Sequence, residues 1–100
     1  MIYLFRDRLD FSESPAAFTL DGQLQGTSYR GTYSRLELTP GRHQLGGYAG
    51  DSGHIEFSVE AGQLYFIRHT LTRVGGFELS FFQPVSAESG RQAVLRYELN

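Results

Sequence analysis

The stretch from His54 to Val59, HIEFSV, is the clearest structural signal in the chain. Ile55, Phe57 and Val59 alternate with polar residues, which is typical of a β-strand that buries one face and exposes the other. The residues that follow, EAGQ at positions 60–63, predict a turn around Gly62. This pattern therefore predicts a strand followed by a tight reversal.

The next stretch, Leu64 to Thr72 (LYFIRHTLT), is the longest strand candidate in the sequence. It carries apolar residues on both faces, which favours a central strand covered on two sides. Further strands are indicated in both directions along the chain. They are Ile2 to Arg6, Ala16 to Leu20, a short strand through Leu24, a strand with Leu36 and Leu38 inward, His43 to Tyr48, and Phe77 to Gln83.

Two turns between these strands have well-defined chemistry. Asp21-Gly22 is a strong hairpin signal, because a type I′ turn needs positive φ angles that Gly adopts freely. Pro40-Gly41 predicts a second tight hairpin, in which Pro presets φ and Gly takes the left-handed position. Turn signals recur at roughly the 8–12-residue spacing of sandwiches and barrels built from short strands.

Residues 1–100 are thus expected to form one all-β domain, a single-domain β-sandwich of about seven short, mainly antiparallel strands. The C-terminal segment leaves two alternatives open. Ser86 is placed to cap a short helix over Ala87 to Leu95, although Gly90 in its middle costs about 1 kcal/mol relative to Ala. The other alternative is a strand through Ala93, Leu95, Tyr97 and Leu99.

Composition excludes several classes of function. The chain has no Cys, which excludes disulfides, Cys-based zinc sites and thiol nucleophiles, and it has no Lys to form a Schiff base. A net charge of −2 argues against a nucleic-acid partner. No segment approaches the roughly 18 apolar residues of a membrane span.

Candidate catalytic and metal-binding patterns are weak. Gly50-Asp51-Ser52-Gly53 followed by His54 looks like the nucleophile segment of trypsin-like proteases, but these residue types are also those that turns prefer. His43, His54 and His69 are better explained without a metal, with His54 beside Glu56 on an outward face and His69 hydrogen-bonded in mid-strand. We therefore expect no catalytic residues, no metal and no cofactor.

Exposed aromatic and basic residues are the best candidate contact surface. They are Tyr29, Arg30, Tyr33 and Arg35, an interleaved pattern that suits the anchors of a protein interface. Replacing both Tyr29 and Tyr33 with Ala is expected to abolish partner binding without lowering the melting temperature. Phe82 is a second candidate, because successive strand residues face opposite ways and one of Phe81 and Phe82 must point away from the core unless both faces are covered.

Turn and strand motifs along most of the chain carry a family resemblance. They are IYLFR at 2–6, LDGQ at 20–23, LELTPGRH at 36–43 and EAGQLYFIR at 60–68. The chain resembles a family of small bacterial proteins of unknown function, many of them envelope lipoproteins. It also looks like PEGA-type surface domains, which share the Pro-Gly-x-His turn and a transthyretin-like β-sandwich. The resemblance implies a fold but no catalytic residues, and this chain lacks the lipid-bearing Cys of the lipoproteins.

The leading interpretation is a non-enzymatic β-sandwich that binds another protein or a cell-envelope component. The sequence leaves open whether the chain forms a homodimer. The alternative is a carbohydrate- or peptide-binding module, followed by a small hydrolase. Read from Met1, the chain shows no signal-peptide pattern, which predicts the cytoplasm, whereas a trimmed leader predicts the periplasm or envelope.

The turn assignment makes a testable prediction. Gly41→Val is expected to destabilise the domain by about 1 kcal/mol or more, because a β-branched residue resists the left-handed conformation. Chemical denaturation measures the loss, and an unchanged midpoint would contradict the Pro40-Gly41 assignment.

Overall fold

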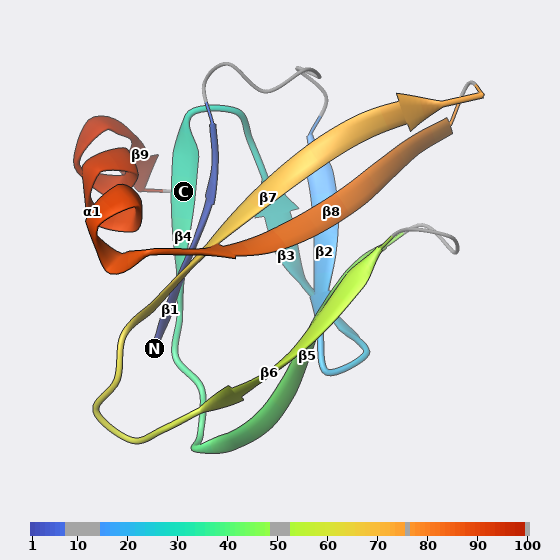
Figure 1. The fold of residues 1–100 in the computed structure, drawn as a ribbon. Helices are drawn as coiled ribbons and strands as arrows, with labels where there is room; N and C mark the ends of the chain where they lie inside the picture. Colours follow the sequence, from blue (N-terminus) through green and yellow to red (C-terminus); the bar gives the residue numbers. More distant parts are fainter. Residues whose placement is uncertain (8–14, 49–52, 76, 100) are drawn as a thin grey trace.

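The computed structural model describes residues 1–7, 15–48, 53–75 and 77–99 (Figure 1). Within these residues the chain forms nine strands and one helix. In order they are β1 (Ile2–Arg6), β2 (Ala16–Leu20), β3 (Gln23–Ser28), β4 (Thr32–Leu36), β5 (Gly41–Gly47), β6 (His54–Val59), β7 (Tyr65–Val74), β8 (Phe77–Val85), α1 (Ala87–Arg96) and β9 (Glu98–Leu99).

The strands form two sheets, and the all-β fold class is confirmed. The five-stranded sheet has the order β8-β7-β1-β4-β9 and the four-stranded sheet the order β3-β2-β5-β6. Pairing is mainly antiparallel, with parallel pairs only at β1–β7 and β4–β9 among the described strands. Strands β1 to β8 correspond to the eight strand candidates of the sequence, and the two-residue β9 after the helix is the additional strand. The polar segment 26–35 contains the end of β3, a turn and most of β4. In that turn Thr32 donates twice to the Tyr29 carbonyl, through its amide at 3.1 Å and its hydroxyl at 2.8 Å.

One core lies between the two sheets. Inward-facing residues of both sheets meet in a single cluster. Its buried members are Ile2, Leu4, Leu36, Ile67 and Phe82 from the five-stranded sheet and Phe18, Leu45 and Val59 from the four-stranded sheet. The alternation expected for residues 54–59 is confirmed, since Val59 is buried and Ile55 and Phe57 pack partly buried against the cluster.

The turns predicted from sequence lie between strands, but one joins different partners than expected. Asp21 and Gly22 form the β2–β3 hairpin turn, and Gly62 lies in the β6–β7 turn. Pro40 and Gly41 do not form a hairpin, because β4 and β5 belong to different sheets and the chain crosses the sandwich there. Gly41 has φ +128° and a Cβ on it would meet nothing within 4 Å, so a larger residue there meets backbone strain rather than a clash.

The C-terminal helix covers the outer face of the five-stranded sheet, and the alternative strand through Ala93 is wrong. The Ser86 hydroxyl caps α1 by accepting from the Ser89 amide at 3.2 Å. Ala93 packs with Phe5 and Phe66 in a second apolar cluster on the sheet side of the helix. Only Glu98 and Leu99 form a strand beyond it.

Gly90 is in the helix because Phe66 leaves no room for a side chain. A Cβ on Gly90 would lie 2.1 Å from Cγ and 2.3 Å from Cβ of Phe66. The clash with the Phe66 Cβ cannot be relieved by rotating the ring. The helix therefore approaches β7 closely, which compensates for the low helix propensity of Gly.

Gly90→Ala is expected to destabilise the domain by about 1–3 kcal/mol through overpacking, although Ala is the better helix former. Gln92→Ala on the exposed side of the same helix is the matched control and should be neutral or slightly stabilising. Chemical denaturation of both variants measures the difference. An increase in stability for Gly90→Ala would show that α1 does not dock against Phe66.

Candidate functional site

The two lateral margins of the sandwich differ. On one side β8 packs against β5 and β6, and the Gly53 amide donates to the Ser80 carbonyl at 2.9 Å, which joins the two sheets. On the other side β3 and β4 make only limited contact. A groove of about 580 Å³ opens there between the sheets.

The groove is lined by residues from both sheets and from the link between them. They are Phe18, Gln25, Gly26, Thr27, Tyr29, Ser34, Arg35, Leu36 and Leu99. Gly26, Thr27 and Ser34 contribute small side chains to its lining, and the buried Phe18 and Leu36 continue the groove into the core. The surface combines exposed polar groups with apolar depth, as ligand-binding clefts commonly do.

Strand edges with unused pairing capacity border the groove. The partner strand β9 pairs with β4 only at Thr32 and Tyr33, so among the described residues no strand covers the outer edge of β4 from Ser34 to Leu36. β3 is the edge of its own sheet, and its pairing with β2 shifts register between Phe18 and Thr19. A bulge of this kind blunts an edge against further pairing. The edge of β4 is therefore the more regular of the two.

The aromatic and basic residues predicted as one contact surface are separated in the structure. Tyr29 is 46 % exposed and lines the groove together with Arg35. Arg30 lies half-buried in the turn before β4 and does not line the groove. Tyr33 packs against the Phe5 cluster under α1.

Phe82 is not a surface residue, which corrects the prediction that it is a contact residue. Phe82 is 6 % exposed and stacks on His69 with ring centroids 4.4 Å apart, whereas Phe81 is 48 % exposed. Ser80, two residues before Phe82, shares the inward face of β8 with it, and a hydrogen bond to His69 holds Ser80 there. A hydroxyl at position 80 gives no sign in the sequence that it lies in the core.

A buried polar network crosses the core. Ser28 Oγ lies 2.8 Å from His69 Nδ1, and His69 Nε2 lies 2.9 Å from Ser80 Oγ. Arg6 Nη1 donates to the Ser28 carbonyl at 3.1 Å, and all four residues are buried. The Ser28–His69 pair has the atoms of a nucleophile and a base, but burial keeps a substrate from reaching it, so the network joins strands instead.

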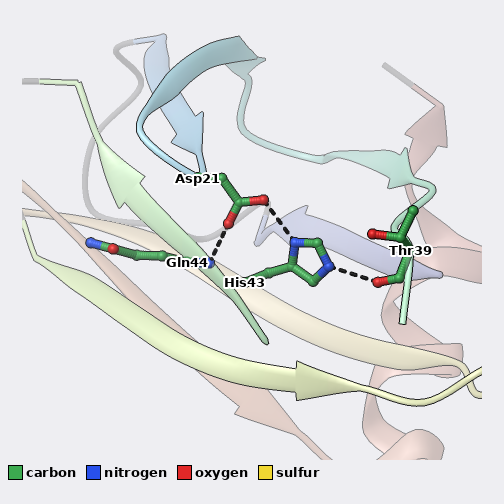
Figure 2. A network of polar contacts seen from close by, with 4 residues as sticks. All are labelled: Asp21, Thr39, His43 and Gln44. Carbon is green, nitrogen blue, oxygen red and sulfur yellow. Dashed lines mark hydrogen bonds and ion pairs between the residues drawn. The ribbon is translucent and has the colours of Figure 1, made fainter. Parts of the chain in front are cut away.

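His43 occupies a second polar cluster near the surface (Figure 2). Its Nδ1 lies 2.7 Å from Asp21 Oδ2, and its Nε2 lies 2.7 Å from the Thr39 carbonyl oxygen. Asp21 Oδ1 also accepts from the Gln44 amide at 2.9 Å. The hydrogen bond with Asp21 raises the pKa of His43, and the same bond lowers the pKa of Asp21.

The histidines do not form a metal site with one another. His69 lies in the core, and His54 is exposed on β6. Glu56 pairs with Arg42 at 3.0 Å across β5 and β6, not with His54 as expected. No cluster of three or more His, Asp or Glu side chains suited to a metal ion occurs in the described part of the chain. Ser52 of the protease-like pattern lies outside the described residues.

Comparison of the chain with protein-family models, curated proteins and solved structures finds no match. The resemblance to PEGA-type and transthyretin-like domains therefore stays a prediction. Within the described residues, no helix has the length and apolar character needed to cross a membrane.

The two tyrosines of the predicted surface are expected to behave differently. Tyr33→Ala should lower the free energy of unfolding by about 1–3 kcal/mol, because Tyr33 contacts the Tyr3 ring edge-on at 5.7 Å and packs under α1. Tyr29→Ala should change it by less than about 0.5 kcal/mol. Equal losses, measured by chemical denaturation, would contradict the separation of these two side chains.

Proposed function

We propose that this protein is a non-enzymatic β-sandwich that binds an extended segment of another protein in the groove between β3 and β4. The observation that supports this proposal is the groove itself. It is bordered by an edge of β4 that β9 covers only at Thr32 and Tyr33. An exposed strand edge presents N–H and C=O groups that an added strand can pair with.

The backbone geometry favours an extended peptide as the occupant. The odd-numbered residues of β4 point their backbone N–H and C=O groups toward β9. This follows from the parallel pairing of Tyr33 with Leu99 and from the Glu98 amide, which donates to the Gly31 carbonyl at 3.2 Å. Because N–H and C=O of one residue point to the same side of a strand, Arg35 offers both groups beyond Leu99. A peptide lying about 4.8 Å from β4 would continue the line of β9 along this edge.

The side chains around the groove suggest what the peptide carries. Tyr29 and Leu99 are exposed and apolar, which suits a partner with apolar side chains at alternate positions. Arg35 is the one charged residue among the described residues that line the groove. Its guanidinium lies over the Tyr3 ring at 5.9 Å and beside the Met1 sulfur at 3.7 Å, neither of which neutralises its charge. An acidic residue in the partner is therefore complementary to this position.

The alternatives have weaker support. A carbohydrate platform needs coplanar exposed aromatic rings, and only Tyr29 of the predicted pair is at the groove. A hydrolase has little support either. Among the described residues, Ser28 and His69 lie within hydrogen-bond distance but are buried, and both ring nitrogens of His43 already face oxygen atoms. A partner in the cell envelope remains a proposal that follows from the family resemblance alone.

Peptides selected from a displayed random library provide the test, with affinity measured by fluorescence polarisation. Tyr29→Ala and Leu99→Ala should each weaken binding by about tenfold, the effect of removing an anchor side chain. Tyr48→Ala and Leu95→Ala are matched controls, since both residues are exposed and neither lines the groove. These controls should bind as the unchanged protein does.

The strand-pairing geometry is tested with N-methylated versions of a selected peptide. Methylation at alternate residues in one register should weaken binding by about tenfold, because it removes hydrogen bonds to β4, and methylation in the other register should have little effect. Equal effects in both registers, or equal losses in the control variants, would contradict strand addition in this groove.

A further inference from the structure

His43 is held between two oxygen atoms from different parts of the chain (Figure 2). Asp21 belongs to the turn between β2 and β3, and Thr39 belongs to the connection that crosses from β4 to β5. We infer that His43 is a pH-operated clasp, which joins these two segments when its ring is an imidazolium and releases one of them when the ring loses a proton.

The two contacts together require a doubly protonated ring. A carboxylate and a backbone carbonyl are both acceptors only, so each 2.7 Å contact needs an N–H on the facing ring nitrogen. A neutral imidazole has one N–H. Either neutral tautomer therefore leaves a nitrogen lone pair facing an oxygen lone pair at 2.7 Å, and one contact must open.

The surroundings of the ring favour this titration. The His43 side chain is 11 % exposed and the Asp21 side chain 48 % exposed, so protons can exchange at the cluster. Phe57 packs beside the ring at 6.3 Å and carries no charge. Arg42 and Glu56 border the same hollow, where they form an ion pair with each other at 3.0 Å.

The segment that is released follows from the other bonds of the cluster. Asp21 is held to β5 without His43, because the Asp21 amide donates to the Gln44 carbonyl at 2.8 Å and the Gln44 amide donates to Asp21 Oδ1 at 2.9 Å. Thr39 is linked to the cluster through His43 Nε2. Deprotonation is thus expected to free the connection around Thr39 while the β2–β3 turn stays in place.

The sign of the pH dependence follows from the hydrogen bond to Asp21, which raises the pKa of His43 in the folded protein. Stability from the clasp is fully present below the unfolded pKa, about 6.5, and is lost as the pH rises through the folded value. The lowered pKa of Asp21 acts at the acid end, where its contribution is lost as the pH falls through the folded value.

The experiment is an NMR titration of the intact chain from about pH 5 to about pH 9, a range that spans histidine ionisation. It follows the His43 ring ¹⁵N shifts and the Thr39 carbonyl ¹³C shift. We expect both to change with one midpoint, while the Gln44 amide shift changes little. Asp21→Asn, which retains a side chain tolerant of the φ of 52° at position 21, should lower that midpoint, because it removes the carboxylate that raises the pKa of His43.

A stability measurement gives an independent readout. The denaturation midpoint of His43→Gln should lie below that of the unchanged protein at about pH 6 and approach it at about pH 9, after the histidine has lost its proton. His54→Gln, at an exposed position on β6, should keep the unchanged pH profile. Two results would overturn the clasp, even if His43→Gln fails to fold. One is a Thr39 carbonyl ¹³C shift that stays constant while His43 titrates, and the other is a His43 titration midpoint that is the same in Asp21→Asn as in the unchanged protein.

Discussion

The bridge through His69 is the interaction on which the rest of this structure depends. One imidazole on β7 contacts Ser80 of the adjacent strand and Ser28 at the end of β3 in the opposite sheet. Buried polar groups are costly when one partner is missing, so the three side chains favour one arrangement of the two sheets strongly over others. Since the chain leaves β3 at Ser28 and enters β4 four residues later, this bridge also positions the link between β3 and β4, whose Tyr29 lines the groove.

This arrangement of the two sheets leaves one lateral margin of the sandwich closed and the other open. The Gly53–Ser80 hydrogen bond draws the β5–β6 hairpin onto β8. On the opposite margin β3 and β4 make only limited contact. The sandwich thus keeps a rigid core and places its groove where two sheet edges separate, which is a common way for a stable scaffold to present a binding surface.

Local sequence patterns predicted most of the strands well, left helix and strand open for the C-terminal segment, and predicted long-range relations poorly. Alternation identified the inward face of residues 54–59, and of the two alternatives for the C-terminal segment the structure has the helix that Ser86 caps. The sequence could not distinguish Phe81 from Phe82, because the inward direction is decided by a polar partner, His69, on another strand. Pro40-Gly41 likewise specifies a change of direction but not which sheet the chain enters next. The candidate surface was only partly predicted, because Tyr33 is covered by a helix whose docking depends on Phe66 and Gly90.

The missing side chain at Gly90 has a consequence for the distant groove. Because Phe66 accepts the helix only at this one position, α1 has a single register on the sheet, and the residues after it reach β4 at a set point. They cover Thr32 and Tyr33 and no more of the described edge. The docking of the helix therefore sets how much of the β4 edge β9 covers and how much is left for a binding partner.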